Sequence, residues 1–98
     1  MAEIIWTQIA LDDLQSIYDY IAKDSIFYAG RFTDQLIERT DILMTNIEAG
    51  RIVPEFENSK LRELIEGSYR IIYYVMSDDR VGIVRIHHSA RLLSNLFV

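Results

Sequence analysis

Arginines and histidines are the residues of this 98-residue chain that are best suited to do chemistry. Arg62 and Arg70 stand inside apolar segments typical of strands, and His87 and His88 end a third such segment. A charged side chain beside an apolar core must reach a solvent-facing surface or a partner. A guanidinium holds a phosphate or carboxylate through two parallel hydrogen bonds, and a histidine transfers protons near neutral pH. The pattern indicates a small sheet that presents arginines and histidines on one face as a working surface.

Each of these residues also has a purely structural interpretation. Arg70 can form an ion pair with a nearby carboxylate, for which Glu63 is the candidate within the chain, and the residues alone favour that ion pair. Arg62 and Glu63 are adjacent in a strand, so only one of them can share a face with Arg70. We expect Arg62 and Glu63 to brace the sheet against a helix or a loop. Either histidine is equally well interpreted as a hydrogen-bonded structural residue.

A metal site is not expected. His87 and His88 are neighbours in a strand, so their side chains point to opposite sides of the sheet. Zinc usually takes three or four protein ligands, no third nearby candidate stands out, and the chain contains no cysteine. We therefore expect no metal and no other cofactor.

The charge distribution separates the two halves of the chain. Residues 1–49 hold three basic residues against nine acidic ones, whereas residues 50–98 hold seven basic residues against six acidic ones. The acidic residues Asp12, Asp13 and Asp19 are interpreted as a solvated helix face. A general nucleic-acid binder would show a basic excess over the whole domain. The composition therefore favours a local basic patch that suits an acidic partner.

The first half of the chain is expected to supply one strand and two helices. Glu3–Trp6 is apolar enough for a strand, and Thr7 can cap the helix that follows it. A second helix is expected to begin after a cap at Ser25 and to run to about Ala49. Gly50 suits the left-handed position that ends a helix. Because the connection is short, the helices should form an antiparallel hairpin.

The second half is expected to supply the sheet. Two strands surround a turn at Glu66-Gly67-Ser68, and the turn Ser77–Arg80 leads into a third strand that ends at His88. A short edge strand is expected near Arg51–Val53. With both helices on one sheet face, this order predicts an α+β fold in one domain that spans residues 1–98.

The expected location is the cytoplasm, without membrane association. No apolar run approaches the ~20 residues of a membrane span. Met1-Ala2-Glu3 lacks the basic start of a signal peptide, and the absence of cysteine suits a reducing compartment. The apolar tail that begins at Leu92 is expected either to pack back onto the domain or to contact a partner.

Several segments resemble the toxins of bacterial toxin–antitoxin modules, in the ParE/RelE superfamily and closest to its ParE branch. Together these segments span nearly the whole chain. The resemblance also implies a curved, mainly antiparallel sheet. The N-terminal residues from Ile5-Trp6 to Ala22 fit the same pattern. The segments that carry the resemblance are Gly50-Arg51-Ile52-Val53-Pro54-Glu55, Leu61-Arg62-Glu63-Leu64, Tyr69-Arg70-Ile71-Ile72-Tyr73 and His88-Ser89-Ala90-Arg91.

The resemblance implies a protein poison of the plasmid-stabilisation type rather than an enzyme. ParE toxins inhibit DNA gyrase and are neutralised by a cognate ParD-like antitoxin, which wraps a helix and an extended segment around the toxin. The chain should then form a hetero-oligomer with its antitoxin. The residues that would contact the target or the antitoxin are Arg62, Arg70, His88, Arg91, Leu92, Leu96 and Phe97.

The alternative is a ribosome-dependent mRNA endonuclease of the RelE or YoeB type, with the ribosome and mRNA as partners. Arg70 would hold the scissile phosphate, and Glu55 with His87 or His88 would act as base and acid. The loop from Pro54 to Lys60 argues against this, because it has only one lysine where RelE-like relatives have several cations to stabilise the transition state. The net charge of −5 also disfavours docking on ribosomal RNA. A third possibility is a toxin fold that has lost its toxicity.

Overall fold

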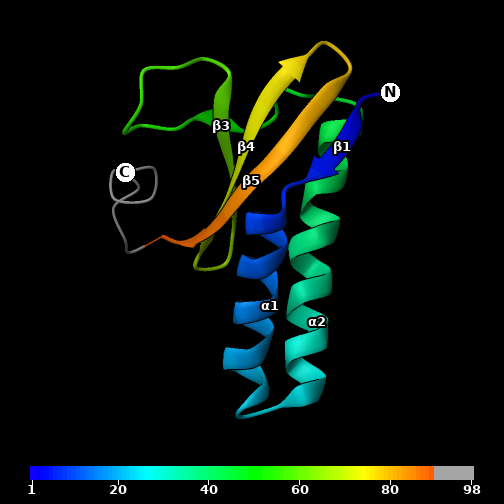
Figure 1. Ribbon diagram of the computed structural model, residues 1–98, viewed down its shortest axis with the longest axis vertical. Helices are drawn as coiled ribbons and strands as arrows, with labels where there is room; N and C mark the ends of the chain where they lie inside the picture. Colours follow the sequence, from blue (N-terminus) through cyan, green and yellow to red (C-terminus); the bar gives the residue numbers. More distant parts are fainter. Residues whose placement is uncertain (90–98) are drawn as a thin grey trace.

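The computed structural model describes residues 1–89, within which five strands form one sheet in the order β1-β5-β4-β3-β2 (Figure 1). The strand β1 runs parallel to β5, and all other neighbours are antiparallel. The expected first strand, edge strand and two hairpin turns are confirmed. The strands are β1 (Glu3–Trp6), β2 (Arg51–Ile52), β3 (Leu61–Glu66), β4 (Tyr69–Ser77) and β5 (Arg80–His88).

The helices α1 (Gln8–Ala22) and α2 (Ile26–Arg39) form the expected antiparallel hairpin and lie against one face of the sheet (Figure 1). Both predicted caps are present. The hydroxyl of Thr7 accepts a hydrogen bond from the amide of Ala10, and the hydroxyl of Ser25 accepts one from the amide of Tyr28. In the described residues no helix is long and apolar enough to cross a bilayer.

The second helix is shorter than the sequence predicted. The expectation that it runs to about Ala49 is wrong, because α2 ends at Arg39 and a 3-10 helix, η1 (Thr40–Met44), follows it. The physical reason lies in side chains that bond to the local backbone. The hydroxyl of Thr40 donates to the carbonyl of Ile37 at 2.6 Å, and the hydroxyl of Thr45 donates to the carbonyl of Ile42 at 3.3 Å. Such bonds compete with the helical pattern and favour its end.

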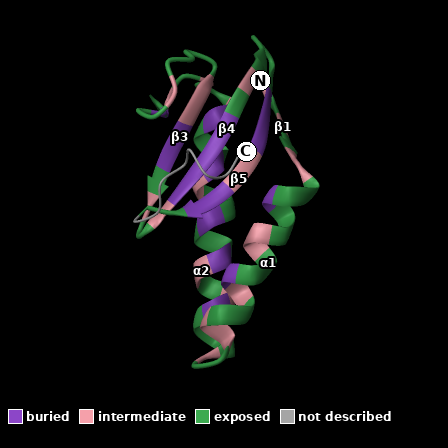
Figure 2. Ribbon diagram, turned by 60° about the vertical axis from the view of Figure 1, so that its left-hand side comes forward, coloured by how far each residue is buried: buried purple, intermediate pink, exposed green. Residues whose placement is uncertain are grey.

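The main core fills the space between the helices and the sheet. Buried positions gather on β3, β4 and β5 and on the inner sides of both helices (Figure 2). Alternation along the strands explains this, because every second side chain points toward the helices. The buried members of this core are Ala10, Ile17, Leu36, Leu43, Leu64, Ile71, Tyr73, Val81, Ile83 and Ile86.

A second, smaller cluster covers part of the opposite sheet face. The β2–β3 loop, residues 53–60, folds back so that Val53 is fully buried against Ile72 of β4. Phe56 packs against the same cluster, together with Leu61 and Val84. The loop is thus held by apolar contacts, and this sheet face is partly filled by the chain itself.

The free edge of β5 is capped by the first helix. The strand β1 pairs only as far as Ile83, and the carboxylate of Asp13 then accepts a hydrogen bond from the amide of Ile86 at 3.0 Å. The same carboxylate holds the guanidinium of Arg85 with two bonds, of 2.8 and 3.0 Å. The interpretation of Asp13 as part of a solvated surface is therefore wrong. Satisfied edge groups protect a strand from pairing with other chains.

Tyr73 and Gly50 join the end of the helical half to the sheet. The buried hydroxyl of Tyr73 accepts a hydrogen bond from the amide of Gly50 and donates one to the carbonyl of Ile47, both at 2.9 Å. Burial raises the pKa of Tyr73, so its hydroxyl stays neutral. Gly50 does not have a positive φ, which among the described residues only Gly67 has. Its role is close packing, since a Cβ there would collide with the carbonyl oxygen of Glu63 and lie 2.7 Å from the Tyr73 ring.

We expect Gly50→Ala to lower the free energy of unfolding by about 1–3 kcal/mol, because the added methyl overpacks a rigid contact. Urea denaturation followed by circular dichroism measures this change. Gly30→Ala is the matched control. A Cβ at Gly30 meets nothing within 4 Å, so this helical substitution should raise stability by about 0.5–1 kcal/mol. Equal effects of the two substitutions would contradict the packing role of Gly50.

Candidate functional site

Four charged side chains meet on the sheet face opposite the helices. Arg70 lies on β4, Glu63 on β3, Arg51 on β2, and Glu55 in the β2–β3 loop. Since Leu64 and its neighbours in register face the helices, the alternate positions Glu63 and Arg70 face the other way. We call Arg51, Glu55, Glu63 and Arg70 the charged cluster.

The cluster is a continuous chain of ion pairs. The Nε of Arg70 donates to Glu63 at 2.5 Å, and its two terminal nitrogens donate to the two carboxylate oxygens of Glu55 at 2.8 Å each. The other oxygen of Glu63 accepts from Arg51 at 2.5 Å. The side chain of Glu63 is fully buried and that of Arg70 is 7% exposed, whereas Glu55 is 23% exposed. The Arg70–Glu63 ion pair expected from the sequence is confirmed.

The two positive and two negative charges of the cluster balance. Hydrogen bonds to Glu55 raise the pKa of Arg70 most strongly, burial acts in the opposite direction, and the bond and charge of Glu63 add to the rise. Arg70 therefore remains protonated at any accessible pH. Buried charges are tolerated only where partners and hydrogen bonds compensate for the lost water, and this network provides both.

The two histidines lie on opposite sides of the sheet, as predicted. His87 pairs in register with Arg70 and is buried, so it belongs to the face of the charged cluster. His88 pairs with Tyr69, and its ring meets the Tyr69 ring edge-on at 5.4 Å between centroids. The expectation that the sheet presents its arginines and histidines on a single face is therefore wrong, because His87 and His88 lie on opposite faces. Within residues 1–89 no group of three or more potential ligands is placed to hold a metal ion.

Arg62 has the bracing role expected from the sequence. Its guanidinium donates to the carbonyls of Ser59 at 3.0 Å and Gly50 at 2.9 Å, and it forms an ion pair with Glu48 at 3.2 Å. These contacts join the segment before β2 to the end of the β2–β3 loop. The remaining contact candidates, Arg91, Leu92, Leu96 and Phe97, lie outside the described residues.

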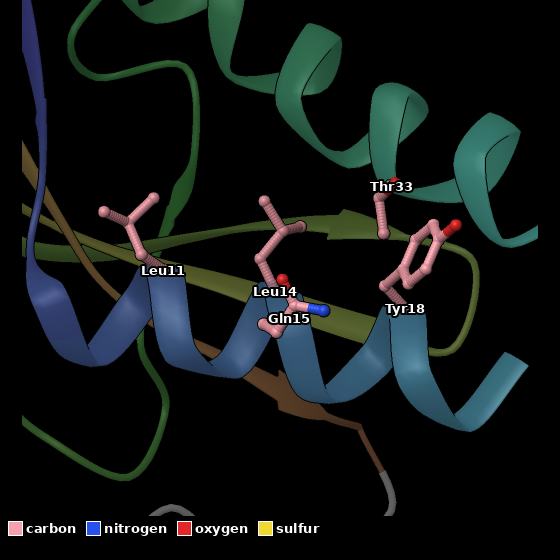
Figure 3. A pocket seen from close by; sticks show the side chains of 5 residues that line it. All are labelled: Leu11, Leu14, Gln15, Tyr18 and Thr33. Atoms are coloured by element: carbon pink, nitrogen blue, oxygen red, sulfur yellow. The ribbon is translucent and has the colours of Figure 1, made fainter. Parts of the chain in front are cut away.

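A second feature is an open groove between the helices. It has a volume of about 280 Å³ and is lined by four residues of α1 with one of α2 facing them (Figure 3). Leu11 is 44% exposed at this groove. We call this the interhelical groove. Its lining residues are Leu11, Leu14, Gln15, Tyr18 and Thr33.

Sequence reasoning missed three parts of these sites. It did not place Arg51 beside Glu63, because pairing of the two-residue strand β2 has no local signal. It did not connect Asp13 with Arg85, which are 72 residues apart. It gave no indication of the interhelical groove, because the apolar spacing along α1 does not show which of its side chains the sheet leaves uncovered.

The match to a known protein family assigns this chain to a class, the toxins of type II toxin–antitoxin modules. Residues 4–93 match the family described as the ParE toxin of the type II toxin–antitoxin system parDE. The chain belongs to this family, and the ParE/RelE resemblance seen in the sequence is confirmed. The family implies an antitoxin as a partner.

Individual relatives agree with this assignment. The chain is 40% identical over 92 residues to Toxin RelE2 of Caulobacter vibrioides, across 94% of this chain and 100% of the relative. A solved chromosomal ParDE system from P. aeruginosa matches with a TM-score of 0.72, 23% identity, and coverage of 90% of this chain and 96% of that chain. YafQ from E. coli matches with a TM-score of 0.51, 14% identity and full coverage of both chains. These two structures show the fold alone, and they confirm the expected α+β arrangement.

We expect Arg70→Met to lower the free energy of unfolding by about 3–5 kcal/mol, because the buried carboxylate of Glu63 loses its buried partner. The double variant Arg70→Met, Glu63→Leu should recover much of this loss, since no buried charge remains unpaired. Urea denaturation of the two single variants and the double variant gives the coupling energy.

Arg80→Ala serves as the control, because Arg80 pairs with Glu3 on the surface, where the two side chains are 52% and 63% exposed. Arg80→Ala should lower the free energy of unfolding by less than about 1 kcal/mol. Additive effects of Arg70→Met and Glu63→Leu would mean that the pair does not act as a unit.

Proposed function

We propose that this toxin acts by binding DNA gyrase and does not cleave RNA. The observation that carries the proposal is the state of the sheet face on which a nuclease would bind its phosphate. There, the guanidinium of Arg70 is already bound by Glu55 and Glu63, and Val53 and Phe56 pack on the same face. The match to the ParE family supports the same choice.

The chemistry of RNA cleavage also fits the charged cluster poorly. A phosphorane-like transition state gains negative charge and needs an excess of cations around it. The charged cluster has no such excess, and Glu63 fixes a buried negative charge beside Arg70. Glu55, which would be the base, is held in the same ion pair as the arginine that would bind the phosphate. While the two are paired, Glu55 cannot act as the base and Arg70 cannot bind the phosphate.

Purified protein should therefore inhibit the ATP-dependent supercoiling of relaxed plasmid by gyrase, in proportion to its concentration. A translation extract with ribosomes and a defined mRNA provides the parallel measurement, in which the transcript should stay intact. Normal supercoiling at a large excess of the toxin would overturn the proposal. Transcripts cut at defined positions, and no longer cut by an Arg70→Ala variant, would establish the nuclease alternative.

We further propose that the interhelical groove receives a helix of the cognate antitoxin. An amphipathic helix binds by placing its apolar side chains in a groove of this kind. Leu11, which is 44% exposed, and Leu14 offer an apolar surface for such a helix, inside an open groove of about 280 Å³.

Leu11→Glu should weaken antitoxin binding by roughly 10- to 100-fold, because it places a charge in the apolar contact. Isothermal titration calorimetry with purified antitoxin measures the affinity. Ile9→Glu is the matched control on the same helix, since Ile9 is 54% exposed and does not line the groove. The same loss of affinity in both variants, or in neither, would argue against the groove.

A further inference from the structure

The two carboxylates that hold Arg70 differ in how firmly the fold fixes them. Glu63 lies on β3, beside β4, and its side chain has no exposed surface. Glu55 belongs to the β2–β3 loop, outside any strand, and its side chain is 23% exposed. Glu63 is therefore a permanent part of the sheet, whereas Glu55 contributes a carboxylate from a segment without regular structure.

The two carboxylates also use different edges of the guanidinium. Glu63 takes the Nε position, and Glu55 takes both terminal nitrogens through a two-bond contact of 2.8 Å per bond. This two-bond edge is the geometry by which arginine recognises a carboxylate of another molecule. The part of Arg70 best suited to external recognition is thus occupied by the chain's own loop.

Rotation of the Glu55 side chain would open this edge without unfolding the loop. Val53 is fully buried and Phe56 packs beside it, so the backbone on both sides of Glu55 is anchored independently of the ion pair. With Glu55 withdrawn, Arg51, Glu63 and Arg70 leave one positive charge in the cluster. A site with one net charge and two parallel donors suits a single carboxylate better than a phosphorane or a phosphate dianion.

We propose that Glu55 is an internal placeholder at a carboxylate-binding site, and that an acidic side chain of the antitoxin replaces it at Arg70 when the complex forms. The exchange keeps Arg70 paired at all times, so it avoids exposing an uncompensated buried charge. The proposal rests on the antitoxin partner that the family implies and is independent of whether gyrase is the target.

Side-chain NMR of Arg70 tests the site. In a Glu55→Ala variant, addition of acetate should shift the Nε–Hε resonance of Arg70 in a saturable way, with an affinity at least roughly tenfold above that of the unmodified chain. Glu57→Ala is the matched control, because it removes the same charge from the same loop outside the charged cluster. If Glu55→Ala does not fold, Glu55→Gln replaces it in the same titration.

A second measurement identifies the source of the carboxylate. Glu55→Ala should bind the purified antitoxin roughly tenfold more tightly than the unmodified chain, because an internal competitor has been removed, and Glu57→Ala should not. No response of Arg70 to acetate in the folded variant overturns the site. A response to inorganic phosphate that exceeds the response to acetate overturns the carboxylate assignment. Unchanged or weaker antitoxin binding by Glu55→Ala overturns the antitoxin as its source.

Discussion

The burial of a charged arginine beside a fully buried glutamate is the constraint on which the rest of this structure depends. Arg70 and Glu63 stand on neighbouring strands of a sheet whose other face is the main core. Neither charge would be tolerated there alone, since removal from water costs several kcal/mol for each ion. Their pairing, with Glu55 and Arg51 at the two ends, brings the β2–β3 loop and the short edge strand to this face.

This constraint divides the two sheet faces into different kinds of surface. On one face the helical hairpin covers an apolar core, and on the other a loop brings its own small apolar cluster and its own carboxylate. The occupation of this face by the chain itself is the basis of the proposal that it does not bind a phosphodiester. The interhelical groove, by contrast, is open and offers leucine side chains to a partner. Membership of the toxin family, the filled sheet face and the open groove are therefore all compatible with a protein as the partner.

The parts of the fold that could be predicted from the sequence are those with local physical causes. Thr7 and Ser25 cap helices through bonds that span three residues, and alternation alone places Arg70 opposite to Ile71. The cost of an unpaired charge made Glu63 a candidate partner of Arg70, but only the register of β3 on β4 places the two on one face. The resemblance to a toxin family then connected these local features to a complete topology.

The parts that could not be predicted depend on contacts between distant segments. Glu55 reaches Arg70 only because Val53 and Phe56 dock on the far side of the sheet, and no periodic pattern reveals that path. Apolar residues continue at helical spacing beyond Arg39, so periodicity could not reveal the hydroxyl bonds that end α2 there. Asp13 resembled an ordinary exposed acid because its role arises only where β5 extends past β1.

The parallel pairing of β1 with β5 has a consequence for how the toxin is made. The first strand of the chain hydrogen-bonds to the last strand of the sheet, with Glu3 opposite Arg80 and Trp6 opposite Ile83. A growing polypeptide on the ribosome cannot complete this sheet until β5 has emerged, because the partner of its first strand does not yet exist. Fold completion is thereby delayed until residues 80–88 have left the ribosome, as expected for a topology that joins distant segments.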